Sequence, residues 1–302
     1  MAIVKAYQGK CCYPGLGFGA LSCSFFGSSF KSFSVSFCDR VVNIVEIEQG
    51  VAMALALITG ASSGIGKATA ERLAAAGYSL WLTGRRQERL DLLRQQLVDK
   101  YSVQVETFCF DIQKATAVDS FIEQVQSRLS GLDILVNNAG LAKGAEKVQE
   151  AKLSDWDEMI DTNIKGLLFL TRKIVPAMIK AQRGTIVNLG SAAGRWVYPG
   201  GAVYCATKFA VRAISEGLRM DLAGTGIRVC NIEPGMVDTD FSLIRFGDSA
   251  KAKAVYAGMK PLSAADIAES ILWVIQQPAH INIQELVIFP TAQAAVGQVH
   301  RT

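Results

Sequence analysis

Residues 54–77 read ALALITGASSGIGKATAERLAAAG, and this stretch decides the fold. A short apolar run is followed by a turn in which Gly60, Gly64 and Gly66 have G-x-x-x-G-x-G spacing, and then by a helical run. An apolar run of this length suits a buried parallel strand. Backbone amides of the turn and of the helix N-terminus can face a pyrophosphate. The order therefore predicts a dinucleotide-binding site, and the alternative is a plain left-handed turn leading into a helix.

Strand and helix patterns alternate through the rest of the chain. Apolar runs that suit strands occur at 78–83, 103–110, 132–136, 185–189, 227–232 and 283–289, and helical runs occur at 87–100, 114–130, 203–223, 264–276 and from Ser154 onward. This alternation predicts an α/β fold with a doubly wound, seven-stranded parallel sheet and helices on both faces. Residues 240–261 have weak periodicity and mixed charge, which predicts a mobile lid.

The second predicted strand ends in Gly84-Arg85-Arg86, about 20 residues after the glycine turn. A carboxylate at this place would bind the ribose hydroxyls of NAD, and there is none. Guanidinium groups match a phosphate with paired donors, so the two arginines favour the 2′-phosphate of NADP. The alternative is that they only open the charged helix that follows.

Two further strand ends carry residues that suit a bound cofactor. Asp111 follows the third strand and can accept a hydrogen bond from the adenine amino group. The fourth strand runs into Asn137-Asn138-Ala139-Gly140, where small residues allow a close approach of the cofactor.

Tyr204 and Lys208 are four residues apart in a helical run, so they share one face of the helix. A nearby ammonium favours the phenolate, and lowering the tyrosine pKa by roughly 3 units requires about 4 kcal/mol. We expect Lys208 and a bound cationic nicotinamide ring to supply this energy and make Tyr204 a general acid/base. The alternative is a surface tyrosine and lysine on an amphipathic helix.

Ser191 and Asn163 are the other polar candidates. Ser191 follows an apolar run and precedes a glycine turn, so its hydroxyl can hold a substrate oxygen against Tyr204. Asn163 lies within the helix predicted from Ser154, which Leu153 and Asp157 would help to cap. Asparagine is a poor helix former, so its place suggests a function, with a solvent-facing side chain as the alternative.

Composition excludes several other classes of protein. The chain has 302 residues, an apolar share of 50% and a net charge of +4, and its basic residues are scattered, so a nucleic-acid surface is not expected. Seven cysteines show no metal-ligand spacing, and His280 and His300 are the two histidines, so neither a metal site nor a Ser-His-Asp hydrolase is expected. Cys109, Cys205 and Cys230 have apolar neighbours, which predicts buried thiols in a reducing compartment.

Residues 1–52 differ from the rest of the chain and are expected to be a non-domain extension to a single domain at 53–302. They hold six of the fourteen phenylalanines and have no acidic residue before Asp39. Translation starting at Met53, just before the first strand, is the favoured explanation, and an organelle transit peptide is the next. A membrane anchor is a third alternative, but four glycines and four serines in residues 11–30 make a poor hydrocarbon span.

Taken together, TGASSGIG at 59–66, NNAG at 137–140, Ser191, YCATK at 204–208 and PG at 234–235 resemble the short-chain dehydrogenase/reductase family. The resemblance implies a Rossmann fold with Tyr204 as the acid/base and Ser191 orienting the substrate. It also implies that Lys208 holds the nicotinamide ribose and that Asn163 holds a water in a proton relay. The residues expected at the cofactor are Gly60, Ser62, Ser63, Gly64, Ile65, Gly66, Arg85, Arg86, Asp111, Ile112, Asn138, Ala139, Gly140, Tyr204, Lys208, Pro234, Gly235, Val237 and Thr239.

A narrower resemblance rests on TGRRQERL at 83–90, MIDTNIKG at 159–166, IEPG at 232–235, FS at 241–242 with RF at 245–246, PAHINI at 278–283 and the tail VHR at 299–301. These residues are similar to the NADP-dependent 3-hydroxy acid dehydrogenases. That subgroup acts on serine and L-allo-threonine and reduces malonic semialdehyde, and it is usually bacterial, cytosolic and tetrameric. The resemblance therefore implies a cytoplasmic homotetramer without nucleic-acid or membrane partners. The 52-residue extension departs from the subgroup.

Two other functions compete with this prediction. A 3-oxoacyl carrier-protein reductase or a broad carbonyl reductase would share every catalytic residue. A regulatory protein that binds the cofactor without turnover is less favoured, because Asn163, Ser191, Tyr204 and Lys208 are all present.

The carboxylate of a hydroxy acid must meet a cation when it leaves water, since an unpaired buried charge is costly. Arg195 follows Ser191 by four residues, and Arg245 lies in the predicted lid. We expect at least one of them to bind the carboxylate, and Arg245 is slightly favoured. The alternative is that both are solvated surface arginines.

Overall fold

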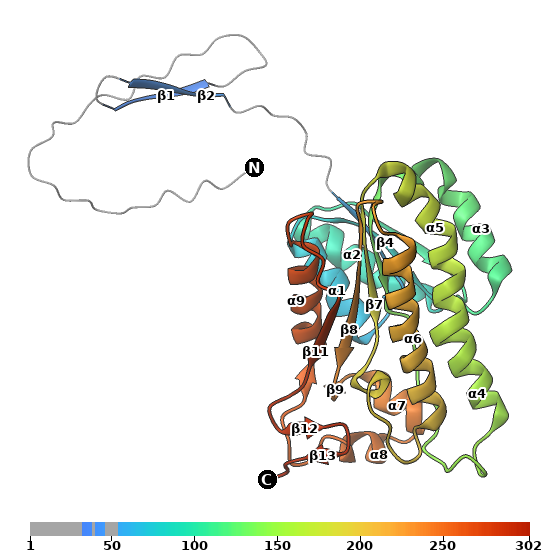
Figure 1. Cartoon of the computed structure of the whole chain (residues 1–302). Helices are drawn as coiled ribbons and strands as arrows, with labels where there is room; N and C mark the ends of the chain where they lie inside the picture. Colours follow the sequence, from blue (N-terminus) through green and yellow to red (C-terminus); the bar gives the residue numbers. More distant parts are fainter. Residues whose placement is uncertain (1–31, 38–39, 46–53) are drawn as a thin grey trace, which may run out of the picture. The chain divides into compact units, whose positions relative to one another are not determined.

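The computed structural model describes residues 32–37, 40–45 and 54–302 (Figure 1). Strands β1 (Ser32–Phe37) and β2 (Arg40–Val45) pair antiparallel with Ser32 opposite Val45. The sequence pattern gives no sign of this pair. The other predictions for residues 1–52, including the start at Met53 and the transit peptide, depend mostly on residues outside the described ranges and stay predictions.

Seven parallel strands form the central sheet, in the order β11-β8-β7-β6-β3-β4-β5. Their bounds are β3 (Leu55–Ile58), β4 (Ser79–Gly84), β5 (Val105–Cys109), β6 (Leu132–Asn137), β7 (Gly184–Leu189), β8 (Ile227–Pro234) and β11 (Glu285–Ile288). The chain order reverses between β3 and β6, and a crevice at such a point is where ligands bind in open α/β sheets. The predicted doubly wound, seven-stranded parallel sheet is confirmed.

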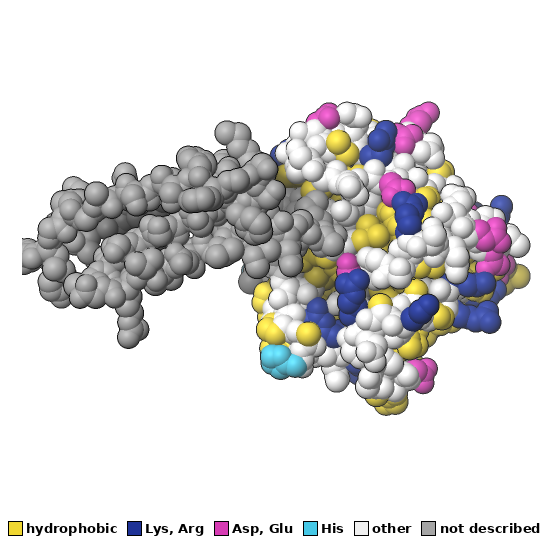
Figure 2. All heavy atoms as spheres, turned by 90° about the horizontal axis from the view of Figure 1, so that it is seen from above, with side chains coloured by type: hydrophobic (Ala, Val, Ile, Leu, Met, Phe, Trp, Pro, Cys, Tyr) yellow, Lys and Arg dark blue, Asp and Glu magenta, His cyan; other side chains and the backbone are white. Residues whose placement is uncertain are grey.

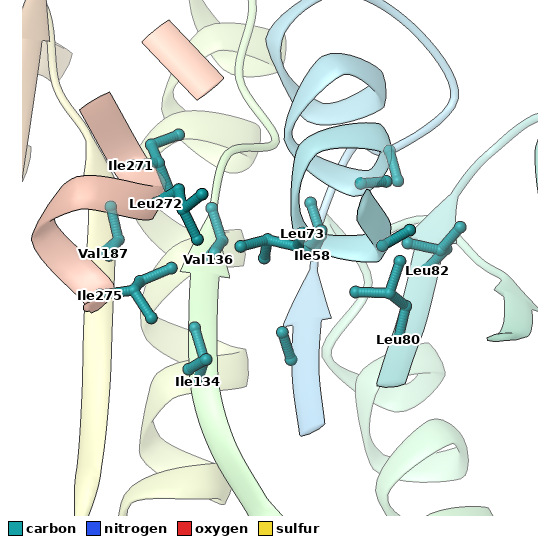
Figure 3. Packing of buried hydrophobic residues seen from close by; sticks show 14 of the residues in the cluster. Ile58, Leu73, Leu80, Leu82, Ile134, Val136, Val187, Ile271, Leu272 and Ile275 are labelled. Carbon is teal, nitrogen blue, oxygen red and sulfur yellow. The ribbon is translucent and has the colours of Figure 1, made fainter. Parts of the chain in front are cut away.

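Helices cover both faces of the sheet. One apolar cluster joins the strands to α1 (Gly64–Ala75), α2 (Gln87–Tyr101) and α9 (Ala264–Ile275). Figure 3 shows part of it, with Ile58 and Val136 of the strands packed between Leu73 of α1 and Leu272 of α9. A second cluster packs α3 (Ala115–Val125), the turn η1 (Gln126–Gly131) and α5 (Leu167–Ala181) on the opposite face, beside α6 (Ala202–Asp221). Alternate strand residues enter the two clusters, as the two-residue period of a strand requires.

A row of buried asparagines crosses three neighbouring strands. Asn137, Asn188 and Asn231 are in register on β6, β7 and β8. The Asn137 amide donates to Asn188 Oδ1 at 2.9 Å and to Thr171 Oγ1 at 2.9 Å, and the Asn188 amide donates to Ser215 Oγ at 2.9 Å. The row therefore ties the sheet to α5 and α6 by hydrogen bonds within the apolar interior.

The helix predicted from Ser154 is divided. It consists of α4 (Leu153–Ile160), a π-helical segment η2 (Asp161–Gly166) and then α5. Helix α4 starts at Leu153 after Lys152, without a side-chain cap, so the predicted capping by Leu153, Ser154 and Asp157 is wrong. The wider π-helical turn places Asn163 in the interior.

The segment predicted as a lid forms two short helices, α7 (Asp240–Phe246) and α8 (Ser249–Ala254). It is bracketed by β9 (Val237–Asp238) and β10 (Leu262–Ser263), which pair in parallel, and the antiparallel pair β12 (Gln293–Ala295) and β13 (Gln298–Val299) follows near the C-terminus. In Figure 1, α7, α8, β12 and β13 gather at one end of the sheet. The predicted mobility of this segment stays a prediction.

Surface features of the described residues complete the fold. Figure 2 shows one face, on which basic side chains are spread singly and in small groups among acidic and apolar ones. None of the helices in residues 54–302 is both long and apolar enough to pass through a membrane. Cys205 and Cys230 are buried as predicted, but Cys109 is exposed, because it is the last residue of β5 at the edge of the sheet.

Candidate active site

A cavity of about 740 Å³ is lined by segments that follow β3 to β8 and by α7. Its polar lining includes Ser191, Tyr204 and Lys208, and its basic lining also includes Arg85 and Arg86. Of the predicted site residues, all except Gly66, Asn163 and Arg195 line it. Segments that are far apart in the sequence therefore meet at one site.

The glycine turn fits a dinucleotide diphosphate. Gly60 and Gly64 have φ angles of +65° and +54°, which other residues rarely adopt. Gly66 lies behind them in α1, where a Cβ would come within 2.4 Å of Asn138 Nδ2 and 2.5 Å of Gly60 O. The Ser63 side chain makes no capping bond to α1. The first amides of the helix are therefore available to an anion in the cavity.

The two arginines after β4 differ in their surroundings. Arg86 donates to Ser62 Oγ and Ser63 Oγ, each at 2.8 Å, and so lies against the glycine turn. Arg85 is about half exposed, and its Nη1 is 3.7 Å from Glu158 Oε1, while Glu158 Oε2 is 3.3 Å from Lys143 Nζ. Both arginines line the cavity that the glycine turn also lines.

Tyr204 and Lys208 lie on α6 and are both buried. The Lys208 ammonium donates to Leu189 O at 2.7 Å and is 5.9 Å from the centroid of the Tyr204 ring. Ser191 starts the short turn η3 (Ala192–Gly194), where its Oγ accepts a hydrogen bond from Ala193 N at 3.1 Å. The serine, tyrosine and lysine therefore share one wall of the cavity.

Burial governs the ionisation of Tyr204 in the protein alone. Burial raises the pKa of Tyr204 well above its usual value, although a hydrogen bond with Ser191 and the charge of Arg245 act in the other direction. Burial also lowers the pKa of Lys208 to about 8. The predicted lowering of the Tyr204 pKa counts on two charges, Lys208 and a bound nicotinamide ring, and it stays a prediction because the protein alone has only the first. That lowering then depends on the second charge in the prediction, the bound nicotinamide ring.

Asn163 acts on the site through the backbone. Its Oδ1 accepts from Leu141 N at 2.9 Å, and its Nδ2 donates to Leu141 O at 2.9 Å and to Thr207 Oγ1 at 3.0 Å. The side chain thus clamps the loop after β6 to α6. The sequence did not predict that Leu141 and Thr207 are the partners of Asn163. The one sequence signal for these bonds was an asparagine within a helical run. A role of Asn163 in a water relay stays a prediction.

The two candidate substrate arginines lie in different places. Arg195 is outside the cavity lining and donates to the carboxylates of Glu233 and Glu285. Its charge is already neutralised, so the expectation that it binds a substrate carboxylate is not supported. Arg245 lines the cavity.

Arg245 has no acidic partner within salt-bridge distance among the described residues. It donates to Gly144 O at 2.9 Å, Tyr198 Oη at 2.9 Å and Gly200 O at 3.2 Å. Its guanidinium also lies 5.2 Å from the centroid of the Tyr198 ring and 5.3 Å from that of Phe246. Neutral acceptors and rings hold the cation in place and leave its charge available.

The sequence pattern of the family described as short chain dehydrogenase matches residues 54–245. The chain belongs to this family. The predicted family and its oxidoreductase class are confirmed. Among residues 54–302, no group of three or more histidine, cysteine or acidic side chains is placed to hold a metal ion.

Three relatives of this short-chain dehydrogenase indicate what it resembles. Sulfoacetaldehyde reductase 2 of Chromohalobacter salexigens is 47% identical over 80% of this chain and 95% of its own length. The NADP-dependent 3-hydroxy acid dehydrogenase YdfG of Escherichia coli is 43% identical over 82% of this chain and 99% of its own length. A solved serine dehydrogenase, in a closed form complexed with NADP+, is 43% identical with a TM-score of 0.76, over 82% of this chain and 100% of that one.

Proposed function

We propose that the protein is an NADP-dependent oxidoreductase that moves hydride between NADP(H) and the C3 carbinol or carbonyl of small 3-hydroxy acids. Serine, L-allo-threonine and the pair 3-hydroxypropionate and malonic semialdehyde are the proposed substrates. The observation that carries the proposal is Arg245, a partly buried cation in the cavity wall without an acidic partner among the described residues. A cytoplasmic homotetramer is proposed from the narrower resemblance alone.

The choice of NADP rests on two basic residues of the cavity. Arg85 and Arg86 line it, and guanidinium groups bind phosphate through paired donors. The names of the YdfG relative and of the solved serine dehydrogenase both include this cofactor. Five basic and three acidic side chains line the whole cavity, a balance that favours anionic ligands.

The residues of the cavity support a proton transfer next to a hydride transfer. A bound nicotinamide ring supplies the chemistry of accepting or donating the hydride. In the oxidation direction, Tyr204 takes the proton of the C3 hydroxyl, while Ser191 holds the oxygen by a hydrogen bond. Lys208 places a positive charge beside Tyr204 and stabilises its phenolate. In reduction, Tyr204 returns the proton to the oxygen.

Substrate selection is assigned to Arg245. It lies one helical turn after Phe241, whose ring centroid is 5.5 Å from that of Tyr204. A carboxylate bound by Arg245 would place a short carbon chain toward Tyr204. A sulfonate has the same charge, so the match to a sulfoacetaldehyde reductase agrees with an anion site of this kind.

The test is reduction of malonic semialdehyde, sulfoacetaldehyde and propanal, each with NADPH and NADH, by the wild type and by Arg245→Met. A lost charge-assisted hydrogen bond costs about 1.5–3 kcal/mol, or roughly tenfold to a hundredfold in kcat/KM for the anionic aldehydes. Propanal should lose less than about threefold, because it has no charge to bind. The loss in kcat/KM for an anionic aldehyde is divided by the loss for propanal. This ratio cancels the effect of the lost hydrogen bonds between Arg245 and the protein, because that effect is common to both substrates.

Arg89→Met is the matched control. Arg89 Nη1 lies 3.6 Å from Oδ2 of Asp240, which is the first residue of α7, the helix that carries Arg245. Arg89→Met should leave the ratio unchanged. Equal losses for malonic semialdehyde and propanal in Arg245→Met would refute the assignment of Arg245. Faster turnover with NADH would refute the cofactor. A strong preference for 3-oxoacyl thioesters would favour the carrier-protein reductase instead.

A further inference from the structure

Arg195 joins two strands to the loop that carries Ser191. It follows η3 directly, and its Nε and Nη2 donate to Glu233 at the end of β8 and to Glu285 at the start of β11. Glu233 is fully buried, and its other oxygen accepts from Asn231 Nδ2 at 2.6 Å. A buried carboxylate with both oxygens bonded is a fixed point in the interior.

The loop between β7 and Arg195 has little freedom to move. At Gly190, a Cβ would lie 2.5 Å from Asn231 Oδ1 and 3.0 Å from Glu233 Cγ, so the loop lies directly against β8. At Gly194, a Cβ would lie 2.7 Å from Lys208 O, so the other end lies against α6. Ser191 stands between these two contacts, and Arg195 closes the loop.

We propose that Arg195 is a positioning residue, which sets the place of the Ser191 hydroxyl relative to Tyr204 through its ion pair with buried Glu233. The inference rests on the proposed function only in taking Ser191 as the group that holds the substrate oxygen. Without Arg195, the loop would still touch β8 at Gly190 and α6 at Gly194. These two contacts set how closely the loop can approach β8 and α6, but they do not attract the loop to them. The ion pair supplies the attraction at the Arg195 end of the loop, while the hydrogen bond from Lys208 to Leu189 O holds the other end.

A double-mutant cycle tests this positioning. Arg195→Met, Ser191→Ala and the combined variant are compared in kcat and in the Kd for NADPH, with the substrate that the wild type reduces fastest, charged or neutral. A displacement near 1 Å at a reacting group can cost about a hundredfold, so we expect Arg195→Met to lose tenfold to a hundredfold in kcat. In the Ser191→Ala background the same change should cost less than about threefold, because coupled residues are not additive. The Kd for NADPH should change little.

Two further variants separate positioning from general loss of structure. Arg212 donates to the other oxygen of Glu285, Oε1, at 3.2 Å, so Arg212→Met leaves both ion pairs of Arg195 in place and should keep kcat within about twofold. Arg195→Lys keeps the charge and should recover part of the lost kcat. If Arg195→Met does not fold, Arg195→Met with Glu233→Gln removes both charges and replaces it in the cycle.

A loss in Arg195→Met that is equally large in the Ser191→Ala background would overturn the proposal, as would an unchanged kcat. The cycle uses whichever aldehyde or ketone the wild type reduces fastest. Its result therefore stays valid even if the proposed class of substrate is wrong. Failure of the proposed function appears instead as slow turnover of the anionic aldehydes by the wild type.

Discussion

At the residue scale, the buried ammonium of Lys208 ties a proposed catalytic group to the stability of the fold. Burial lowers the pKa of Lys208 from 10.5 to about 8, which corresponds to a cost of about 3 kcal/mol for holding the charge at neutral pH. The unfolded lysine keeps its proton up to pH 10.5, and the folded one only to about pH 8. The free energy of unfolding therefore rises with pH between these values.

We expect Lys208→Met to lose activity and yet to raise the free energy of unfolding of the cofactor-free protein at pH 7 by roughly 1–3 kcal/mol. This advantage should shrink at pH 9.5, where the wild type has released the proton. Urea unfolding at both pH values measures it. The exposed Lys114→Met is the control and should change stability by less than about 0.5 kcal/mol. An advantage that grows with pH would contradict the burial cost.

Arg195 and Arg245 show what single residues do not reveal in a sequence. Both are arginines near predicted site residues, and the chemistry of the side chain is the same. Glu285, which neutralises Arg195, is 90 positions away in the sequence and adjoins it only because β11 pairs with β8. Arg85 and Arg86 were predictable because strand ends in this fold have a fixed relation to the glycine turn.

At the scale of elements, the π-helical segment η2 holds Asn163 against Leu141. We expect Asn163→Ala to leave the buried amide and carbonyl of Leu141 unpaired, at roughly 1–3 kcal/mol for each group. The variant should also bind the cofactor more weakly, because Leu141 lines the cavity. Urea unfolding and NADPH titration measure the two effects.

Asp161→Asn is the control in the same segment. Asp161 pairs with Lys165 at 2.8 Å on the surface, and such pairs contribute less than about 1 kcal/mol. If Asn163→Ala is no less stable than Asp161→Asn, then the clamp on Leu141 does not hold the loop.

The elements of the central sheet were predictable because each strand is an apolar run between turn signals. The π-helical segment was not, since its residues continue the helical pattern of α4 and α5, and asparagine was the single misfit. Strands β9, β10, β12 and β13 have two or three residues each, too few for any period to appear.

At the scale of the whole molecule, a chain that starts at Met53 should keep the thermal midpoint and the activity of the full-length protein. The described residues that line the cavity run from Gly60 to Val296, and the described apolar clusters begin at Leu55. Thermal unfolding and the aldehyde assay of both forms measure this. Loss of soluble, active protein would show that residues 1–52 contribute to the fold.

The topology was predictable because alternating strands and helices allow few arrangements in a parallel sheet, and the site lies where that topology reverses. The identity of the substrate and the oligomeric state could not be predicted from the order of strands and helices. The proposed substrate rests on one cation in a wall of the cavity and the proposed assembly on a resemblance alone, and neither is tied to a periodic pattern in the chain.

The asparagine row has a consequence for folding. A strand that pairs one residue out of register turns its asparagine to the other face of the sheet, away from Thr171 or Ser215. Each amide left unpaired in the apolar interior costs about 1–3 kcal/mol, so mispaired sheets are strongly disfavoured against the native one. Ser191 and Glu233 follow Asn188 and Asn231 by only three and two residues. The register of β7 and β8 therefore also sets which residues lie side by side where the Ser191 loop meets Glu233.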